Sequence, residues 1–181
     1  MKIDVREAEA EDGPAFIAVI EAAFGREEGP ELVELVSTLL KDETAHPLWS
    51  LVGVQGERVV GHILFTSTQL DPQTTGERSA IMAPLAVDPS CQKQGVGREL
   101  IARGLERLRA DGVRLVFVLG DPKYYSRHGF VAAGALGYQP PYPLPEQYAG
   151  AWMVQELAGG SLEAFRGTVR CANALDHPKY W

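Results

Sequence analysis

The sequence predicts an α+β fold: a mixed, mostly antiparallel sheet of about six or seven strands with helices on both faces. Two observations lead to this prediction. Three β-rich runs follow one another in residues 48–87, which is typical of an antiparallel meander. A strand, a helix and a second strand then occupy residues 78–119, which is the order of a central βαβ unit with parallel strands.

The N-terminal region is expected to begin with an edge strand and to continue with two helices. Residues 2–6 alternate in polarity like a short strand. Residues 11–24 place apolar side chains on one helical face, and residues 31–41 repeat Leu and Val at helical spacing. The Glu-rich residues 25–29 between them predict a polar break that separates the two helices.

The strands of the expected sheet follow from runs of apolar and β-branched residues. Residues 48–55 and 58–68 are separated by Gly56 and predict a hairpin, which residues 78–87 extend with a third strand. Residues 113–119 are almost continuously apolar, as in a parallel strand that is buried on both faces. A further strand is expected where apolar residues resume at 152–157.

The loop before the helix at residues 97–110 suits a phosphate group. Gly95 and Gly97 have no side chain to keep an anion away from the backbone, and glycine tolerates positive φ. The free amide groups and the dipole of the helix N-terminus favour negative charge, and Lys93 and Arg98 add positive charge. The sequence therefore predicts a pyrophosphate site. The order Gln-x-x-Gly-x-Gly fits neither the dinucleotide fingerprint nor the P-loop.

Composition and charge narrow the function further. With 181 residues, of which 45% are hydrophobic, the chain can bury one sizeable core. The formal net charge of −7 and the absence of a dense Lys/Arg run argue against a nucleic-acid surface and favour cationic substrates. No apolar run is long enough to cross a bilayer. Cys91 and Cys171 lie far apart, so we expect no disulfide, no metal site and a reducing cytoplasm.

Two segments carry a resemblance to a known family. The run from Leu85 to Pro89, followed by Gln-x-x-Gly-x-Gly, resembles the acetyl-CoA-binding motif of the GNAT superfamily of N-acyltransferases. Residues 124–130 resemble the tyrosine-to-Gly-Phe segment that follows the fifth strand in that family. Residues 119–122 are similar to the YhbS-type bacterial members. Together with the N-terminal region, the resemblance covers residues 1–133.

This resemblance implies an acetyl-CoA-dependent N-acetyltransferase that moves the acetyl group directly to a primary amine, on a small molecule or a peptide or protein, in a ternary complex. The parallel strands would splay apart and coenzyme A would lie in the gap. The strand edge near the thioester and the pantetheine comprises Leu85, Ala86 and Val87. The loop residues that would hold the pyrophosphate are Gln92, Lys93, Gln94, Gly95, Val96, Gly97 and Arg98. Tyr125 stands where the family places its catalytic tyrosine, which would protonate the departing thiolate.

The general base is left open by the sequence. No carboxylate lies between residues 79 and 87, so water, Glu21, Glu27, Glu28 and His62 all remain candidates. A lone histidine on an apolar strand, such as His62, is more often a hydrogen-bonded core residue than a catalyst. Cys91 has no evident base beside it and is not expected to act as a nucleophile.

Residues 1–157 are expected to form the acetyltransferase domain. Residues 158–181 would then be a C-terminal tail whose aromatic side chains pack on the same domain; these are Phe165, Tyr180 and Trp181. Two alternatives stay open. One is a non-catalytic acyl-CoA-binding or regulatory module. The other is a structural domain that associates, as in a homodimer, through its aromatic tail.

Overall fold

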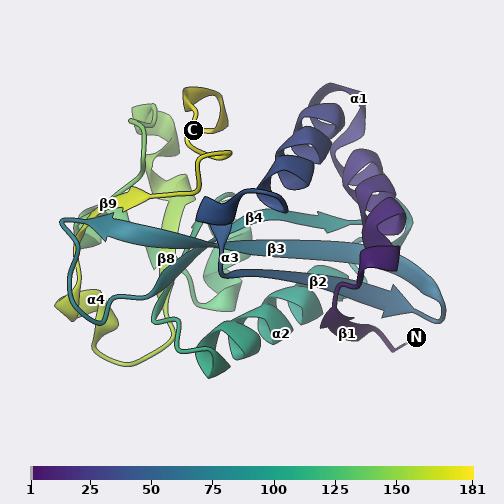
Figure 1. Ribbon diagram of the computed structural model, residues 1–181, viewed down its shortest axis with the longest axis horizontal. Coiled ribbons are helices and arrows are strands. Elements are labelled where there is room, and N and C mark those ends of the chain that lie inside the picture. Colours follow the sequence, from purple (N-terminus) through teal and green to yellow (C-terminus); the bar gives the residue numbers. More distant parts are fainter. Residues whose placement is uncertain (1) are drawn as a thin grey trace.

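The structure is a computed structural model that describes residues 2–181. Within this range nine strands form a sheet in the order β1-β2-β3-β4-β5-β8-β6; β9 pairs with β3, and β7 pairs with β9 (Figure 1). The strands are β1 (Asp4–Glu7), β2 (Leu48–Gln55), β3 (Arg58–Asp71), β4 (Ser79–Val87), β5 (Leu115–Leu119), β6 (Val131–Ala132), β7 (Tyr138–Gln139), β8 (Trp152–Glu156) and β9 (Gly167–Arg170).

The α-helices are α1 (Gly13–Leu39), α2 (Val96–Ala110), α3 (Pro122–Tyr125) and α4 (Ser161–Ala164). Short 3-10 turns complete the fold at Ala10–Asp12, Glu43–Ala45, Pro89–Cys91, Ser126–His128, Gly134–Leu136, Glu146–Ala151 and Pro178–Tyr180.

The predicted fold class is confirmed. Strands β1 to β4 pair antiparallel in sequence order, and β4 and β5 pair parallel through α2. The expected count of six or seven strands was low for a physical reason. Strands β6, β7 and β9 are only two or four residues long, and such short segments show no periodicity in the sequence.

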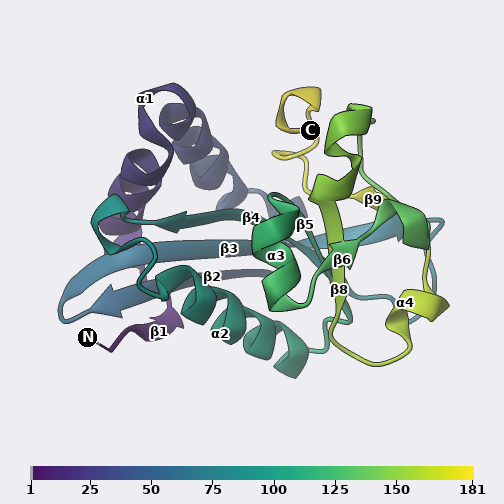
Figure 2. The ribbon, with the colours of Figure 1, turned by 180° about the vertical axis from the view of Figure 1, so that it is seen from behind.

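Two cores lie on opposite faces of the sheet. Leu64 of β3 faces the α1 side, and the next residue, Phe65, faces the α2 side, as the alternation of a strand requires. Figures 1 and 2 show α1 and α2 on opposite sides of these strands. The predicted apolar face of α2 is buried against the sheet; it comprises Leu100, Ile101, Leu105 and Leu108.

The prediction of a polar break over residues 25–29 was wrong in extent. Helical structure runs from Gly13 to Leu39, and only Gly25 leaves it, with φ 73° and ψ −168°. Two helical arms therefore meet at a sharp bend, which Figure 1 shows as a V. Glycine suits this position because positive φ is strained for other residues. The arms approach closely: a β-carbon on Gly29 would lie 2.9 Å from the carbonyl oxygen of Glu21.

The parallel strands separate partway along their length. Pairing between β4 and β5 begins at Ser79↔Leu115 and ends at Met82↔Val118. Beyond this point β5 continues to pair with β8, up to Leu119↔Trp152, while residues 85–87 of β4 keep pairing only with β3. The backbone edge of β4 that faces β5 is thus left without a strand partner, which leaves hydrogen-bonding groups for another molecule.

The C-terminal residues add a strand to the sheet and side chains to the core. Strand β9 pairs with residues 69–71 of β3, and Phe165 is buried with the α1-side core. Trp181 packs edge to face on Trp152, with ring centroids 5.6 Å apart. Lys179 pairs with Glu31, so the chain end lies beside the second arm of α1. This places the C-terminal residues next to the gap between β4 and β5.

Candidate functional site

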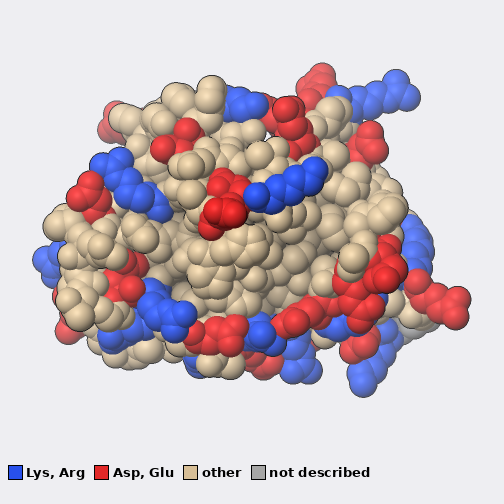
Figure 3. All heavy atoms as spheres, in the orientation of Figure 1, with Lys and Arg blue, Asp and Glu red and all other residues tan. Residues whose placement is uncertain are grey.

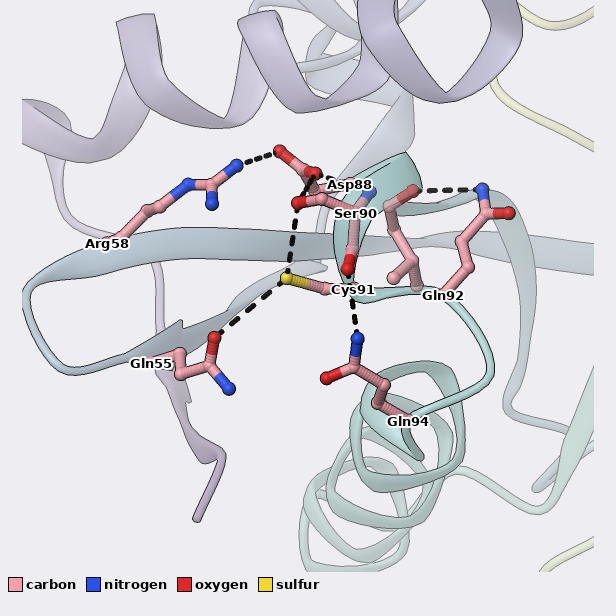
Figure 4. Close-up of polar contacts among 8 residues, drawn as sticks. Gln55, Arg58, Asp88, Ser90, Cys91, Gln92 and Gln94 are labelled. Carbon is pink, nitrogen blue, oxygen red and sulfur yellow. Dashed lines mark hydrogen bonds and ion pairs between the residues drawn. The ribbon is translucent and has the colours of Figure 1, made fainter. Parts of the chain in front are cut away.

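A hydrogen-bonded turn holds the loop that joins β4 to α2 (Figure 4). Asp88 accepts hydrogen bonds from the backbone amide of Ser90 at 2.9 Å and from its hydroxyl at 2.5 Å, and it pairs with Arg58. These hydrogen bonds from Ser90, together with Arg58, lower the pKa of the Asp88 carboxyl group. Gln92 donates to the carbonyl oxygen of Val87 at 3.2 Å, and Gln94 donates to that of Ser90 at 2.9 Å.

The N-terminus of α2 is open to a ligand. Its N-cap is Gly95, in the left-handed region with φ 92°, and within residues 2–181 no side-chain hydrogen bond caps the first turn. Lys93 also has a positive φ of 61°, a conformation that is uncommon outside glycine. Because the first amide groups of a helix have no partner within it, they are available to an anion. The α2 N-terminus thus has the geometry predicted for a diphosphate.

A cavity of about 510 Å³ lies in front of this helix N-terminus. Its positively charged residues are Lys93, Arg98 and Arg127, the last of which comes from the turn after α3. His128 also lines the cavity. Its pKa lies below the ordinary value, first because of partial burial and then because of the charges of Arg98 and Arg127. The cavity therefore carries a positive field suited to phosphate.

Most of the residues predicted to bind the cofactor meet at this cavity. Those that line it are Leu85, Val87, Gln92, Lys93, Gly95, Val96, Gly97 and Arg98. Two do not. Ala86 turns its methyl group into the α1-side core, and Gln94 lines a separate polar pocket beside β1. The binding roles of all ten residues stay predictions.

The two tyrosines are placed by the short helix α3. Asp121 caps it, because its carboxylate accepts the amide hydrogen of Lys123 at 2.9 Å, and Pro122 occupies the first turn. The Tyr125 ring lies against Gly120, where a β-carbon would come within 2.3 Å of a ring carbon. Burial raises the pKa of Tyr125, so its phenol stays protonated at neutral pH.

Tyr125 lines a second, mostly apolar cavity of about 360 Å³. This cavity lies between the second arm of α1, the diverging ends of β4 and β5, and the C-terminal residues. Phe24 and Leu85 line both cavities. A molecule anchored at the α2 N-terminus can therefore extend along the β4 edge and reach the phenol of Tyr125.

The candidates for a general base lie elsewhere. Glu21, Glu27 and Glu28 are exposed on α1 and line neither cavity. His62 is fully buried, with a hydrogen bond of 2.9 Å to Ser50, and it stacks on a phenylalanine of α1. This confirms the interpretation of His62 as a hydrogen-bonded core residue.

Cys91 is also buried, and its neighbours are Ser90 and Gln55. Among residues 2–181, no group of three or more His, Cys, Asp or Glu side chains is placed to hold a metal ion. Within the same range, none of the helices combines the length and the apolar character that crossing a bilayer requires.

Several residues at the site could not be predicted from the sequence. The contact of Gly120 with Tyr125 gave no signal in the sequence, because it exists only after α3 folds back. Leu175, Tyr180 and Trp181 line the second cavity, although they lie about 50 residues beyond the tyrosines in the sequence. Aromatic residues in a tail predict burial, but they do not indicate which surface they cover.

Comparisons with known proteins agree with this geometry. The family model described as an acetyltransferase (GNAT) domain matches residues 4–133. The chain is 45% identical to the uncharacterized N-acetyltransferase YjhQ of Escherichia coli K12 over 141 residues, which is 77% of this chain and 77% of YjhQ.

Solved structures give the same result. The crystal structure of the GNAT family N-acetyltransferase YhbS from Escherichia coli, in complex with CoA, has a TM-score of 0.85 at 28% identity and covers 98% of this chain and 93% of that one. A GNAT family acetyltransferase from Brucella melitensis in complex with acetyl-CoA has a TM-score of 0.75 at 26% identity and covers 97% of this chain and 99% of that one. The resemblance to YhbS-type members is thereby confirmed.

Proposed function

Because this chain belongs to the GNAT acetyltransferase family, we propose that it transfers the acetyl group of acetyl-CoA directly to a primary amine in a ternary complex. One observation carries the proposal. The cavity at the α2 N-terminus and the cavity beside Tyr125 share Phe24 and Leu85, so one extended cofactor can bridge an anion site and a buried phenol.

The cofactor would be held mainly by backbone groups. Its pyrophosphate would accept hydrogen bonds from the amides of Gly95, Val96 and Gly97, with Lys93 and Arg98 adding charge-assisted contacts. Its pantetheine amides would pair with the free edge of β4 at residues 85–87, where no strand of the described residues lies on the β5 side. The CoA bound to YhbS and the acetyl-CoA bound to the Brucella protein support this assignment.

The proposed reaction starts from a neutral amine, because an ammonium group has no lone pair for attack. An acceptor that arrives as ammonium first gives one proton to water, and the neutral nitrogen then forms a bond to the thioester carbonyl carbon. The attached nitrogen gives a second proton to water before the carbonyl group re-forms. A backbone amide of β4 between Leu85 and Val87 would stabilise the negative charge that develops on the carbonyl oxygen. The carbon–sulfur bond then breaks, and the phenol of Tyr125 donates its proton to the departing thiolate. Tyr125 is reprotonated from water.

The test has two measurements on the purified protein. Titration calorimetry should detect binding of CoA and acetyl-CoA, and free thiol should appear from acetyl-CoA only when an amine acceptor is added. If calorimetry detects neither CoA nor acetyl-CoA, the proposal fails at the binding step. Binding without thiol release over a broad amine panel would instead favour the acyl-CoA-binding module.

A further inference from the structure

We infer that the acceptor is a primary monoamine with an apolar body, and that the C-terminal residues form the wall that selects it. This inference rests on the proposed function, since it concerns the acceptor side of the same site. The cavity beside Tyr125, about 360 Å³, falls in the size range of small-molecule pockets, and the thioester end of the proposed cofactor would occupy part of it, so the space left fits a small acceptor.

The charge in this cavity is sparse. Among the described residues that line it, Asp121 is the one whose side chain carries a formal charge, and the other side chains are apolar or aromatic. A single ammonium group placed at Asp121 is compensated, but each additional ammonium group on the acceptor would enter apolar surroundings without a partner. The lining therefore favours one amine on an apolar body and disfavours polyamines.

Asp121 and Tyr125 lie one helical turn apart. The backbone amide of Tyr125 donates to the carbonyl oxygen of Asp121 at 3.0 Å, and Oδ1 of Asp121 is engaged by the amide of Lys123. Oδ2 accepts no hydrogen bond from any residue in the range 2–181. Asp121 is exposed, so its carboxylate lies where the cavity meets solvent. An ammonium group attracted there arrives at the end of the cavity that contains the phenol.

The C-terminal wall is fixed in place before any ligand binds. The indole of Trp181 donates from Nε1 to the carbonyl oxygen of Leu175 at 3.2 Å and packs edge to face on Trp152. Lys179 forms an ion pair of 3.0 Å with Glu31 on the second arm of α1. An aromatic wall held in this way offers edge-to-face contact to an aromatic acceptor and an electron-rich surface to its ammonium group.

The sharpest test compares hexylamine with hexamethylenediamine, because these acceptors differ only in a second ammonium group at the far end. Phenethylamine is added as a monoamine with an aromatic body. We expect kcat/KM for hexylamine and phenethylamine to exceed that for the diamine by at least about tenfold. Asp121→Asn retains the helix cap and should raise KM for hexylamine about fivefold, as expected for an exposed charge pair.

Two variants test the wall itself. Trp181→Ala should lower kcat/KM for phenethylamine about tenfold, mainly through KM, with acetyl-CoA affinity unchanged. Leu32→Glu adds a carboxylate to the apolar wall and should shift the preference toward the diamine. Tyr148→Ala is the matched control, because this aromatic side chain is 54% exposed and lies outside the cavity. Thermal unfolding of each variant verifies that it is folded.

The outcomes separate this inference from the proposed function. Faster turnover with the diamine, or transfer only to peptide amino groups, would overturn the acceptor class and leave the acetyltransferase function intact. An unchanged phenethylamine preference in folded Trp181→Ala would overturn the role of the wall. Acetyl-CoA binding without turnover on any amine would overturn both.

Discussion

The phenol oxygen of Tyr124 lies against the backbone of Gly97, so close that a β-carbon on Gly97 would come within 2.5 Å of it. This contact joins α3 to the first turn of α2 across the gap between β4 and β5. The glycine motif and the tyrosine motif, which are separate in the sequence, are thus packed against each other. Gly97 is constrained by this contact as well as by its proposed closeness to a diphosphate.

We predict that Gly97→Ala weakens acetyl-CoA binding about tenfold, measured by titration calorimetry. The added methyl group must displace either Tyr124 or the first turn of α2, and both line the cavity at the α2 N-terminus. In an unconstrained helix alanine is favoured over glycine by about 1 kcal/mol, so loss of helix propensity cannot explain the effect. Gly13→Ala is the control, because, apart from its chain neighbours and the backbone of its own helix, no atom of residues 2–181 lies within 4 Å of the new methyl group. Unchanged affinity in Gly97→Ala would show that the site tolerates the methyl group.

Tyr125→Phe should lower turnover by about 10²–10⁴-fold while acetyl-CoA affinity persists. The ring remains and only the proton donor is lost. Because burial raises the pKa of the phenol, the wild-type enzyme should show no loss of rate from phenol ionisation up to about pH 10. Steady-state kinetics over a range of pH, with calorimetry alongside, provide the check. Full activity of the variant at every pH would rule out Tyr125 as the proton donor.

Gly120→Ala should reduce turnover about tenfold or more and leave acetyl-CoA affinity within about twofold of wild type. A methyl group on residue 120 would clash with the Tyr125 ring at 2.3 Å, so the phenol must move away from its position beside the β4 edge. Gly134→Ala, with open space around its methyl group, is the matched control. If kcat of Gly120→Ala equals that of wild type, the position of the phenol is not limiting.

Acid should destabilise the protein through His62. Burial lowers its folded-state pKa from 6.5 to about 3, so the folded protein holds it neutral while the unfolded chain binds a proton. The contribution of neutral His62 to the free energy of unfolding is therefore complete above about pH 6.5 and is lost as pH falls toward 3. At 1.36 kcal/mol per pH unit, this histidine lowers the free energy of unfolding by about 2 kcal/mol as the pH falls from 6.5 to about 5.

His62→Gln keeps a hydrogen-bonding group for Ser50 and does not titrate. Its free energy of unfolding, measured with urea at about pH 7 and about pH 5, should fall less with acid than that of wild type. Equal losses in the two proteins would show that other groups control the acid response.

Charged side chains on the surface give little guidance about the site. Over the described residues visible in Figure 3, Lys and Arg are interspersed with Asp and Glu, and no continuous basic patch forms on that face. The positive charge that matters for the proposed cofactor is concentrated in the cavity at the α2 N-terminus, where Arg127 joins Lys93 and Arg98 from a different element.

The sequence by itself determined the features that depend on nearby residues. Apolar periodicity and Gly56 predicted β2 with the bounds that it has, and the predicted start of α2 differs by one residue from the observed start at Val96. The order Gln-x-x-Gly-x-Gly located the open helix N-terminus. These predictions succeed because periodicity, capping and turn chemistry act over a few residues.

Only the tertiary structure decided which distant segments meet. It turned the expected break at residues 25–29 into a single bend at Gly25, and it recruited β9 into the sheet. It also placed the phenol oxygen of Tyr124 against Gly97 and Trp181 in the lining of the cavity beside Tyr125. No local pattern encodes such contacts, because they are selected by how well whole surfaces pack once the sheet and its helices have formed.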